Sequence, residues 1–172
     1  MACSQTLAGF TSLSCTPSKG GVKRVLIANY DDVASFAESA GVITGITMES
    51  GKTFHEYVMR RNTASMTSTL NFDETAGVNF VSTDVVLRFN KLDTPQRIEM
   101  SALVLAETRV IVEDANGKYW LLGKDEPIVP SAGSANTGTQ KTDGSYYELT
   151  LQSSDDTWPM EVSASVIEGL IS

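Results

Sequence analysis

The sequence is poor in the residues that build most catalytic and metal centres. Its 172 residues include two cysteines, Cys3 and Cys15, and a single histidine, His55. In a reducing compartment the two thiols are expected to be free, because neither a bridge nor two further metal ligands is indicated. His55 falls in a strand-like segment, which favours an ordinary sheet position over a triad or zinc site. We therefore expect no metal, no cofactor and no enzymatic activity.

Basic residues and long apolar runs are also scarce. The formal net charge is −8 and the pI about 4.6. Proteins that grip DNA or RNA do so with clustered Lys and Arg, so a phosphate-binding surface is not expected. An acidic wall would instead let a polyanion slide past without sticking. No run approaches the ~20 apolar residues of a membrane helix, and no secretory leader is visible, so we expect no membrane contact and assembly in a cytoplasm.

Carboxylates are present in pairs, but each pair falls at an expected turn or strand end. We interpret these pairs as solvated turns, because acid–base catalysis would need them to converge in an apolar pocket. Asp114 and Asn116 resemble the start of a calcium loop, but the remaining ligands are missing and a turn is favoured. The pairs are Asp31–Asp32, Asp73–Glu74, Glu113–Asp114 and Asp155–Asp156.

The chain divides into an extended segment over residues 1–21 and one β-rich domain over residues 22–172. Strands are predicted at 22–29 and 42–48, with a strand over 53–60 pairing back on the latter and a helical turn over 33–39. Residues 125–144 are predicted to be a long irregular loop, because they contain two prolines and three glycines. Strands are expected again over 146–151 and 162–167.

A long hairpin is predicted over residues 64–89. Met66, Leu70 and Phe72 alternate with polar residues, and residues 73–77 have the composition of a tip. The returning strand spans twelve residues, or roughly 40 Å, longer than a small barrel needs. The surplus indicates an arm that packs on a partner; the alternative is a bent hairpin inside one domain.

The apolar phase of the returning strand changes along its length. Val78 and Phe80 occupy even positions, whereas Val85, Leu87 and Phe89 occupy odd ones. Either a β-bulge near residues 82–84 restores the register, or the distal half buries its apolar side chains elsewhere. On the second reading, a subunit interface is hypothesised at Leu70, Phe72, Val78 and Phe80.

One helix is predicted over about residues 94–107. Pro95 suits its first turn, and the N-cap is either Thr94 or Asp93. Ile98, Ala102 and Leu105 recur at helical spacing and predict a largely buried helix. A second hairpin follows, with Asn116-Gly117 as its turn. Trp120 and Trp158 lie in or beside strand patterns, so core positions are expected for both.

The fold class is therefore mainly β: a small barrel or sandwich of two packed antiparallel sheets, one flanking helix over 94–107 and a hairpin arm over 64–89. Three stretches carry a family resemblance: the hairpin Val-Ile-Val-Glu-Asp-Ala-Asn-Gly-Lys-Tyr-Trp-Leu-Leu-Gly, the Thr-Pro helix, and the Thr/Gly-rich loop before Tyr146-Tyr147-Glu148-Leu149. With residues 3–13 and 22–32, their order resembles that of virion structural proteins from tailed bacteriophages of gut Bacteroidetes, the tail-tube class above all.

This resemblance implies a structural subunit of a phage tail, located in the virion and assembled in the bacterial host cytoplasm. Copies of the chain would be its main partners, forming rings around a channel through which DNA passes, alongside other tail proteins. It brings no catalytic residue. Two alternatives stay open: a head-to-tail connector or collar ring of the same virion, and a carbohydrate-binding adhesin in which exposed Trp residues stack on sugars.

Overall fold

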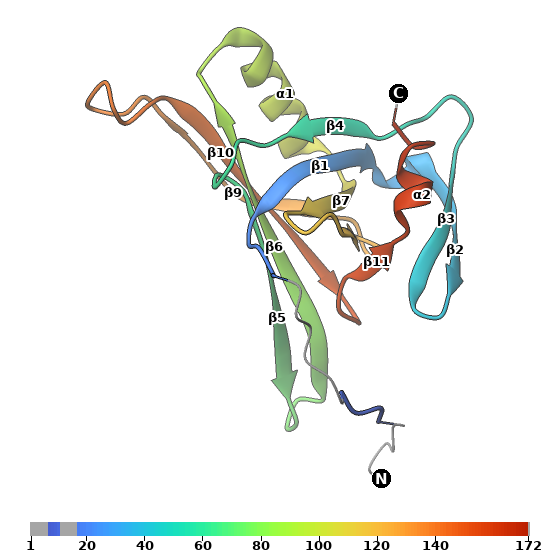
Figure 1. The fold of residues 1–172 in the computed structure, drawn as a ribbon. Helices are drawn as coiled ribbons and strands as arrows, with labels where there is room; N and C mark the ends of the chain where they lie inside the picture. The colour runs from blue at the N-terminus through green and yellow to red at the C-terminus, as the bar shows by residue number, and fades with distance from the viewer. Residues whose placement is uncertain (1–6, 11–16, 172) are drawn as a thin grey trace.

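Two β-sheets account for most of the structure, a computed structural model that describes residues 7–10 and 17–171 (Figure 1). In spatial order, the seven-stranded sheet consists of β2 (Val33–Ser39), β3 (Val42–Met48), β11 (Met160–Val162), β8 (Tyr119–Leu122), β7 (Thr108–Asp114), β1 (Val22–Asn29) and β4 (His55–Val58). The four-stranded sheet consists of β5 (Ser65–Asp73), β6 (Val78–Asn90), β10 (Tyr146–Asp155) and β9 (Val129–Asn136).

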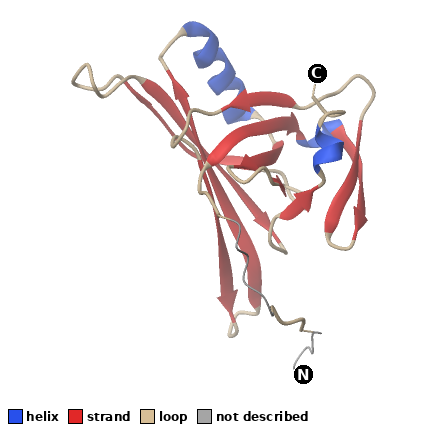
Figure 2. Cartoon of the chain, in the orientation of Figure 1, coloured by secondary structure: helices blue, strands red, loops and turns tan. Residues whose placement is uncertain are grey.

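The mainly β fold with two packed sheets is confirmed, but neither sheet closes into a barrel. All strand pairs are antiparallel except β3 with β11. The helical segments are the 3-10 turn η1 (Tyr30–Asp32), α1 (Thr94–Leu105) and the short α2 (Ala164–Ile167) (Figure 2). Among the described residues, neither α-helix has the length and apolar character that a bilayer crossing would require.

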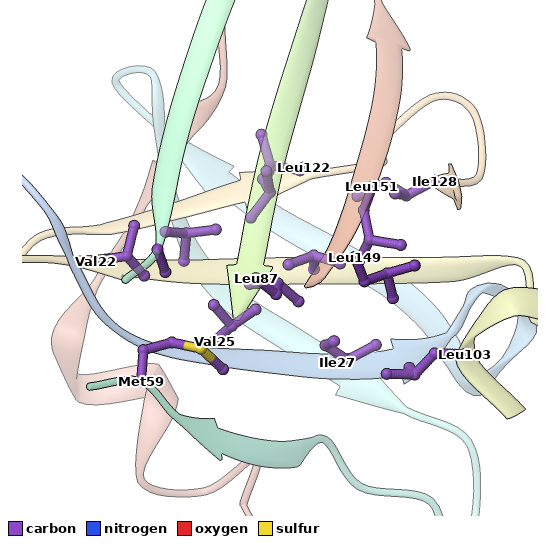
Figure 3. Packing of buried hydrophobic residues seen from close by; sticks show 14 residues of the cluster. Val22, Val25, Ile27, Met59, Leu87, Leu103, Leu122, Ile128, Leu149 and Leu151 are labelled. Carbon is purple, nitrogen blue, oxygen red and sulfur yellow. The ribbon is translucent and has the colours of Figure 1, made fainter. Parts of the chain in front are cut away.

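The main core lies between the two sheets. Val25 and Ile27 of β1 face Leu87 of β6 and Leu149 and Leu151 of β10, as Figure 3 shows. All five side chains are buried. Burial of an aliphatic side chain stabilises by about 1.5–3 kcal/mol, so this layer holds the small sheet on the large one.

A second core lies on the other face of the seven-stranded sheet. Leu26 of β1 and Ile111 of β7 point into it, together with Phe54 and with Ile167 of α2. The strands β1 and β7 are therefore buried on both faces, which explains their nearly continuous apolar sequences.

Four segments differ from their sequence predictions. Residues 33–39 form strand β2, not a helical turn, because register shifts against β3 break the alternation that would have revealed a strand. Strand β4 pairs with β1 and not with residues 42–48, whose second edge is taken by β11. The predicted loop 125–144 contains β9, whose small residues have weak strand preference and are held by β10. The predicted strand 162–167 ends at Val162 and continues as α2.

The long hairpin of β5 and β6 is confirmed, and its tip extends away from the body of the molecule (Figure 1). Its register is unbroken from Ser65 opposite Val86 to Asp73 opposite Val78, so this pair does not contain the β-bulge near residues 82–84 that was one of the two alternatives. The change of apolar phase therefore places Val78 and Phe80 on one face of the hairpin and Val81 on the other.

Helix α1 begins at the cap Asp93, whose carboxylate accepts a hydrogen bond from the Gln96 amide at 3.2 Å. This decides between the two caps that the sequence allowed. The prediction of a largely buried helix is wrong: Leu103 is its one buried residue, and Ile98 and Leu105 are exposed. Apolar residues surround the second half of the helix, so their spacing could not identify the side that packs.

Two leucines of α1 should therefore differ sharply in their effect on stability. We expect Leu103→Ala to lower the free energy of unfolding by about 2–5 kcal/mol, because it leaves a cavity in the main core. In contrast, Leu105→Ala should change it by less than about 0.5 kcal/mol in the monomer, because that side chain is exposed. Urea titration followed by circular dichroism would measure both, and equal losses would contradict the placement of the helix.

Candidate assembly surfaces

No cluster suited to metal binding is found among the residues that the structure describes. His55 lies in strand β4 and is exposed, which confirms the ordinary sheet position predicted for it. Cys3 and Cys15 lie outside the described residues. The candidate functional features are therefore surfaces: the outward face and open edges of the four-stranded sheet, its hairpin, and a groove beside α1.

Two of the paired carboxylates, Asp73 and Asp155, accept hydrogen bonds from backbone amides at a turn or at a strand end. Asp73 accepts hydrogen bonds from the amides of Thr75 at 2.9 Å and Ala76 at 3.1 Å, which closes the hairpin tip. Asp155 differs from the prediction of a solvated turn: it is buried at the end of β10, where it accepts from the amides of Gly123 and Asp125, each at 3.4 Å. Its burial follows from the loop after β8, which folds over it.

Asp114 forms the turn between β7 and β8, and both oxygens of its carboxylate accept hydrogen bonds. One oxygen accepts from the amides of Asn116 at 2.8 Å and Lys118 at 3.0 Å, and the other accepts from the Trp120 indole at 3.2 Å. Burial acts to raise the pKa of Asp114, but these hydrogen bonds outweigh it, so the pKa lies below its ordinary value. The predicted turn is thus confirmed.

The two tryptophans have different environments. Trp120 is half-buried and hydrogen-bonded, but it belongs to neither core, so the core position predicted for it is not reached. Trp158 is 56% exposed, so its predicted core position is wrong. The segment between β10 and β11 in which it lies is too short to fold back over the core.

The four-stranded sheet has one apolar and one polar face. The register places Leu87, Leu149 and Leu151 toward the main core and directs the intervening side chains away from it. This outward face is mostly polar, with Asp73, Asp84 and Glu148 as its acidic groups and Arg88 as a basic one. Arg88 lies over the Tyr146 ring at 3.3 Å, and Gln152 donates to Asp84 at 2.8 Å. The outward face of the sheet is therefore hydrophilic, because charged groups and Ser, Thr and Asn side chains cover most of it.

Both edges of this sheet are open. β5 pairs only with β6, and β9 only with β10, among residues 7–10 and 17–171. An open edge presents unpaired N–H and C=O groups in a row, which is a template for another strand. The sheet can therefore be extended at either end.

The four residues predicted as an interface are divided between the faces of the hairpin. Leu70 and Phe72 share the core-side face with Val81, whereas Val78 and Phe80 lie on the outward face. Leu70 is 49% and Phe72 67% exposed, whereas Val81, opposite Leu70 on β6, is buried, so the cover over this face does not extend to the distal half of the edge strand β5. A single flat contact cannot bury all four.

A groove of about 750 Å³ separates α1 from the edge strand β9. Arg97, Met100, Ser101, Val104 and Leu105 line it at the spacing of one helix face. Residues 130–135 of β9 form the opposite wall. No sequence pattern indicated this groove, because residues 125–144 were predicted to be a loop and one wall of the groove is strand β9.

The other side of α1 is fixed to the body. The Tyr57 hydroxyl of β4 donates a hydrogen bond to Glu99, and burial, with that bond, raises the pKa of Tyr57. Tyr57 also packs edge-on against Phe89, with ring centroids 5.9 Å apart. The helix thus holds its groove-lining face in a fixed position.

No known protein family, curated protein or solved structure matches this chain.

The Asp114 turn predicts a pH-dependent contribution to stability. A carboxyl whose pKa is lowered by folding stabilises above its unfolded pKa, and this stabilisation is lost as the pH falls through the folded value. We expect the unfolding free energy of the parent to exceed that of Asp114→Asn by more at pH 6 than at pH 2.5. Urea titrations at both pH values would measure this, with the exposed Asp156→Asn as control. A difference that grows toward low pH would contradict the assignment.

Proposed function

We propose that the protein is a structural subunit that assembles with copies of itself into rings, stacked as the tube of a bacteriophage tail. The four-stranded sheet of each copy forms one segment of the inner wall. The resemblance described above supports a place in the virion, and the shape of the chain supports the assembly.

The observation that carries this proposal is the pair of open edges on a sheet with one polar face. If β9 of each copy pairs with β5 of the next, the strands join into a continuous inner barrel that has no exposed edge. The outward face of each sheet then lines the channel. The rows of Ser and Thr side chains on this face suit a water-filled bore.

The charges of the outward face fit the passage of DNA. Asp73, Asp84 and Glu148 outnumber Arg88 there, and the whole chain carries a net charge of −8. A bore of this character repels phosphates and keeps a moving genome from binding to the wall.

Negative-stain microscopy of the purified protein at increasing concentration tests the proposal. We expect rings or tubes with a central hole, because apolar surface and strand edges left open in the monomer are buried on assembly. A single ring without stacking would indicate the connector or collar alternative. A monodisperse monomer at every concentration would contradict both.

Shortening the hairpin tests whether the arm contributes. Leu70 and Val81 are opposite one another, so residues 71–80 can be replaced by Asn-Gly, which closes a two-residue turn. We expect the monomer to keep its circular dichroism spectrum and to lose assembly in size-exclusion chromatography. The double variant Glu74→Ser, Thr75→Ser keeps the arm length and is the control; assembly of the shortened chain to the parent level would exclude the arm.

Trp158 supports the adhesin as a second candidate, because an exposed indole can stack on the apolar face of a sugar ring. On that alternative the parent should bind a subset of a glycan array, and Trp158→Ala should reduce the signal at least tenfold. Trp120→Phe, altered at a half-buried position, is the matched control. An array without signal for the parent would remove this candidate.

A further inference from the structure

We propose that the groove between α1 and β9 receives strand β5 of a second copy of this chain, with Leu70 and Phe72 of the incoming strand seated against Val104 and Leu105. The inference rests on the proposed ring and names the two surfaces that meet in it. The contact is head-to-tail: each copy offers its hairpin at one edge of the small sheet and its groove at the other.

Strand direction favours this pairing. The order β5-β6-β10-β9 is antiparallel throughout, and because the number of strands is even, β9 runs opposite to β5. A copy rotated about an axis that follows the strands keeps the direction of its own β5. That strand therefore meets β9 in the antiparallel sense, and the ladder continues without a reversal.

The faces of the sheet agree as well. Leu70 and Phe72 lie on the same face as Leu149, and Leu149 is opposite Gly133 of β9. A strand added beside β9 with its faces preserved directs these two side chains toward the side on which α1 lies. The groove is on that side, because both Leu149 and Gly133 line it.

The contact requires that the incoming β5 be shifted along the strand direction relative to β9, and the tilt of strands in a barrel produces such a shift. Within one copy, Leu70 is level with Asp155, six residues beyond Leu149. Four strands at ~4.8 Å cover roughly 19 Å of circumference, and a barrel tilt of about 35–45° shifts the next copy by roughly 13–19 Å, or about four to six residues. A shift of six toward α1 places Leu70 opposite Gly133. The opposite shift would move Leu70 and Phe72 away from β9 into solvent.

The proposed contact would bury apolar side chains that are exposed in the single copy. Val104 is 47% and Leu105 87% exposed on the groove side, and Leu70 and Phe72 are exposed on the hairpin. These two apolar patches lie at opposite edges of one sheet, so they cannot cover each other within one copy. A closed ring uses each patch once per copy and leaves neither exposed.

Two variants that introduce negative charges into the proposed contact test the pairing. The donor variant carries Leu70→Glu and Phe72→Glu, and the acceptor variant carries Val104→Glu and Leu105→Glu; all four positions are exposed, so both monomers should fold. Each variant alone should remain monomeric. Mixed in equal amounts, they retain one intact pair of surfaces and should form a 1:1 heterodimer that grows no further, as measured by light scattering after size exclusion.

The control variant places the same two added charges elsewhere. It combines Ile98→Glu, on the same helix but outside the groove lining, with Val58→Glu on the exposed strand β4, and it should assemble like the parent. A mixed-disulfide experiment in the Cys3→Ser, Cys15→Ser background, with Phe72→Cys in one copy and Val104→Cys in the other, should give a cross-linked dimer under oxidation.

The outcomes separate this inference from the proposed ring. If the parent never assembles, the proposed function fails first. If the parent assembles and both variants assemble like it, or if the mixture stays monomeric, the ring stands and the groove is not its contact. Assembly that requires residues 1–16, around the exposed Leu7 and Phe10, but not Leu70 and Phe72 would also overturn the inference.

Discussion

The pairing of β1 with β7 is the constraint on which the rest of the structure depends. Its side chains alternate between two cores: Val25 and Val112 point toward the four-stranded sheet, and Leu26 and Ile111 point toward the opposite face. A strand pair buried on both faces fixes the position of everything packed on it. The small sheet is held on one side, and α2 with the C-terminal residues on the other.

This arrangement covers only one face of the small sheet. Core contacts reach Val85, Leu87 and Leu149, but the hairpin extends past them, and the outward face has no layer over it in the part of the chain described here. The sheet is thus rigid where it meets the core and open along both edges. A rigid, open-edged sheet joins to copies of itself with little loss of conformational entropy, which supports the assembly that we propose.

Sequence patterns predicted correctly those elements that are stabilised by residues close together in the chain. The alternation in residues 65–73, the Asn116-Gly117 turn and the Asp93 cap act within a few residues, and the structure contains all three. Elements held by distant partners were missed. β9 consists of small residues and exists because β10 pairs with it, and bulges hide the alternation of β2. Two residues of the hypothesised interface, Leu70 and Phe72, are exposed as the sequence predicted. The division of the four hypothesised interface residues between the two faces of the hairpin could not be predicted, because a β-bulge would have changed the register of β5 with β6.

The sequence by itself determined the mainly β class, the two hairpins, the position of the helix and the acidic surface, because propensity, turn chemistry and charge are properties of short segments. The tertiary structure decided which face of α1 packs, that the sheets stay open instead of closing, and that β9 borders a groove. Those features follow from which strands become neighbours, and at least 56 residues separate the paired positions of β1 with β7 and of β6 with β10. Contacts over such separations depend on the whole chain, so no local pattern could reveal them.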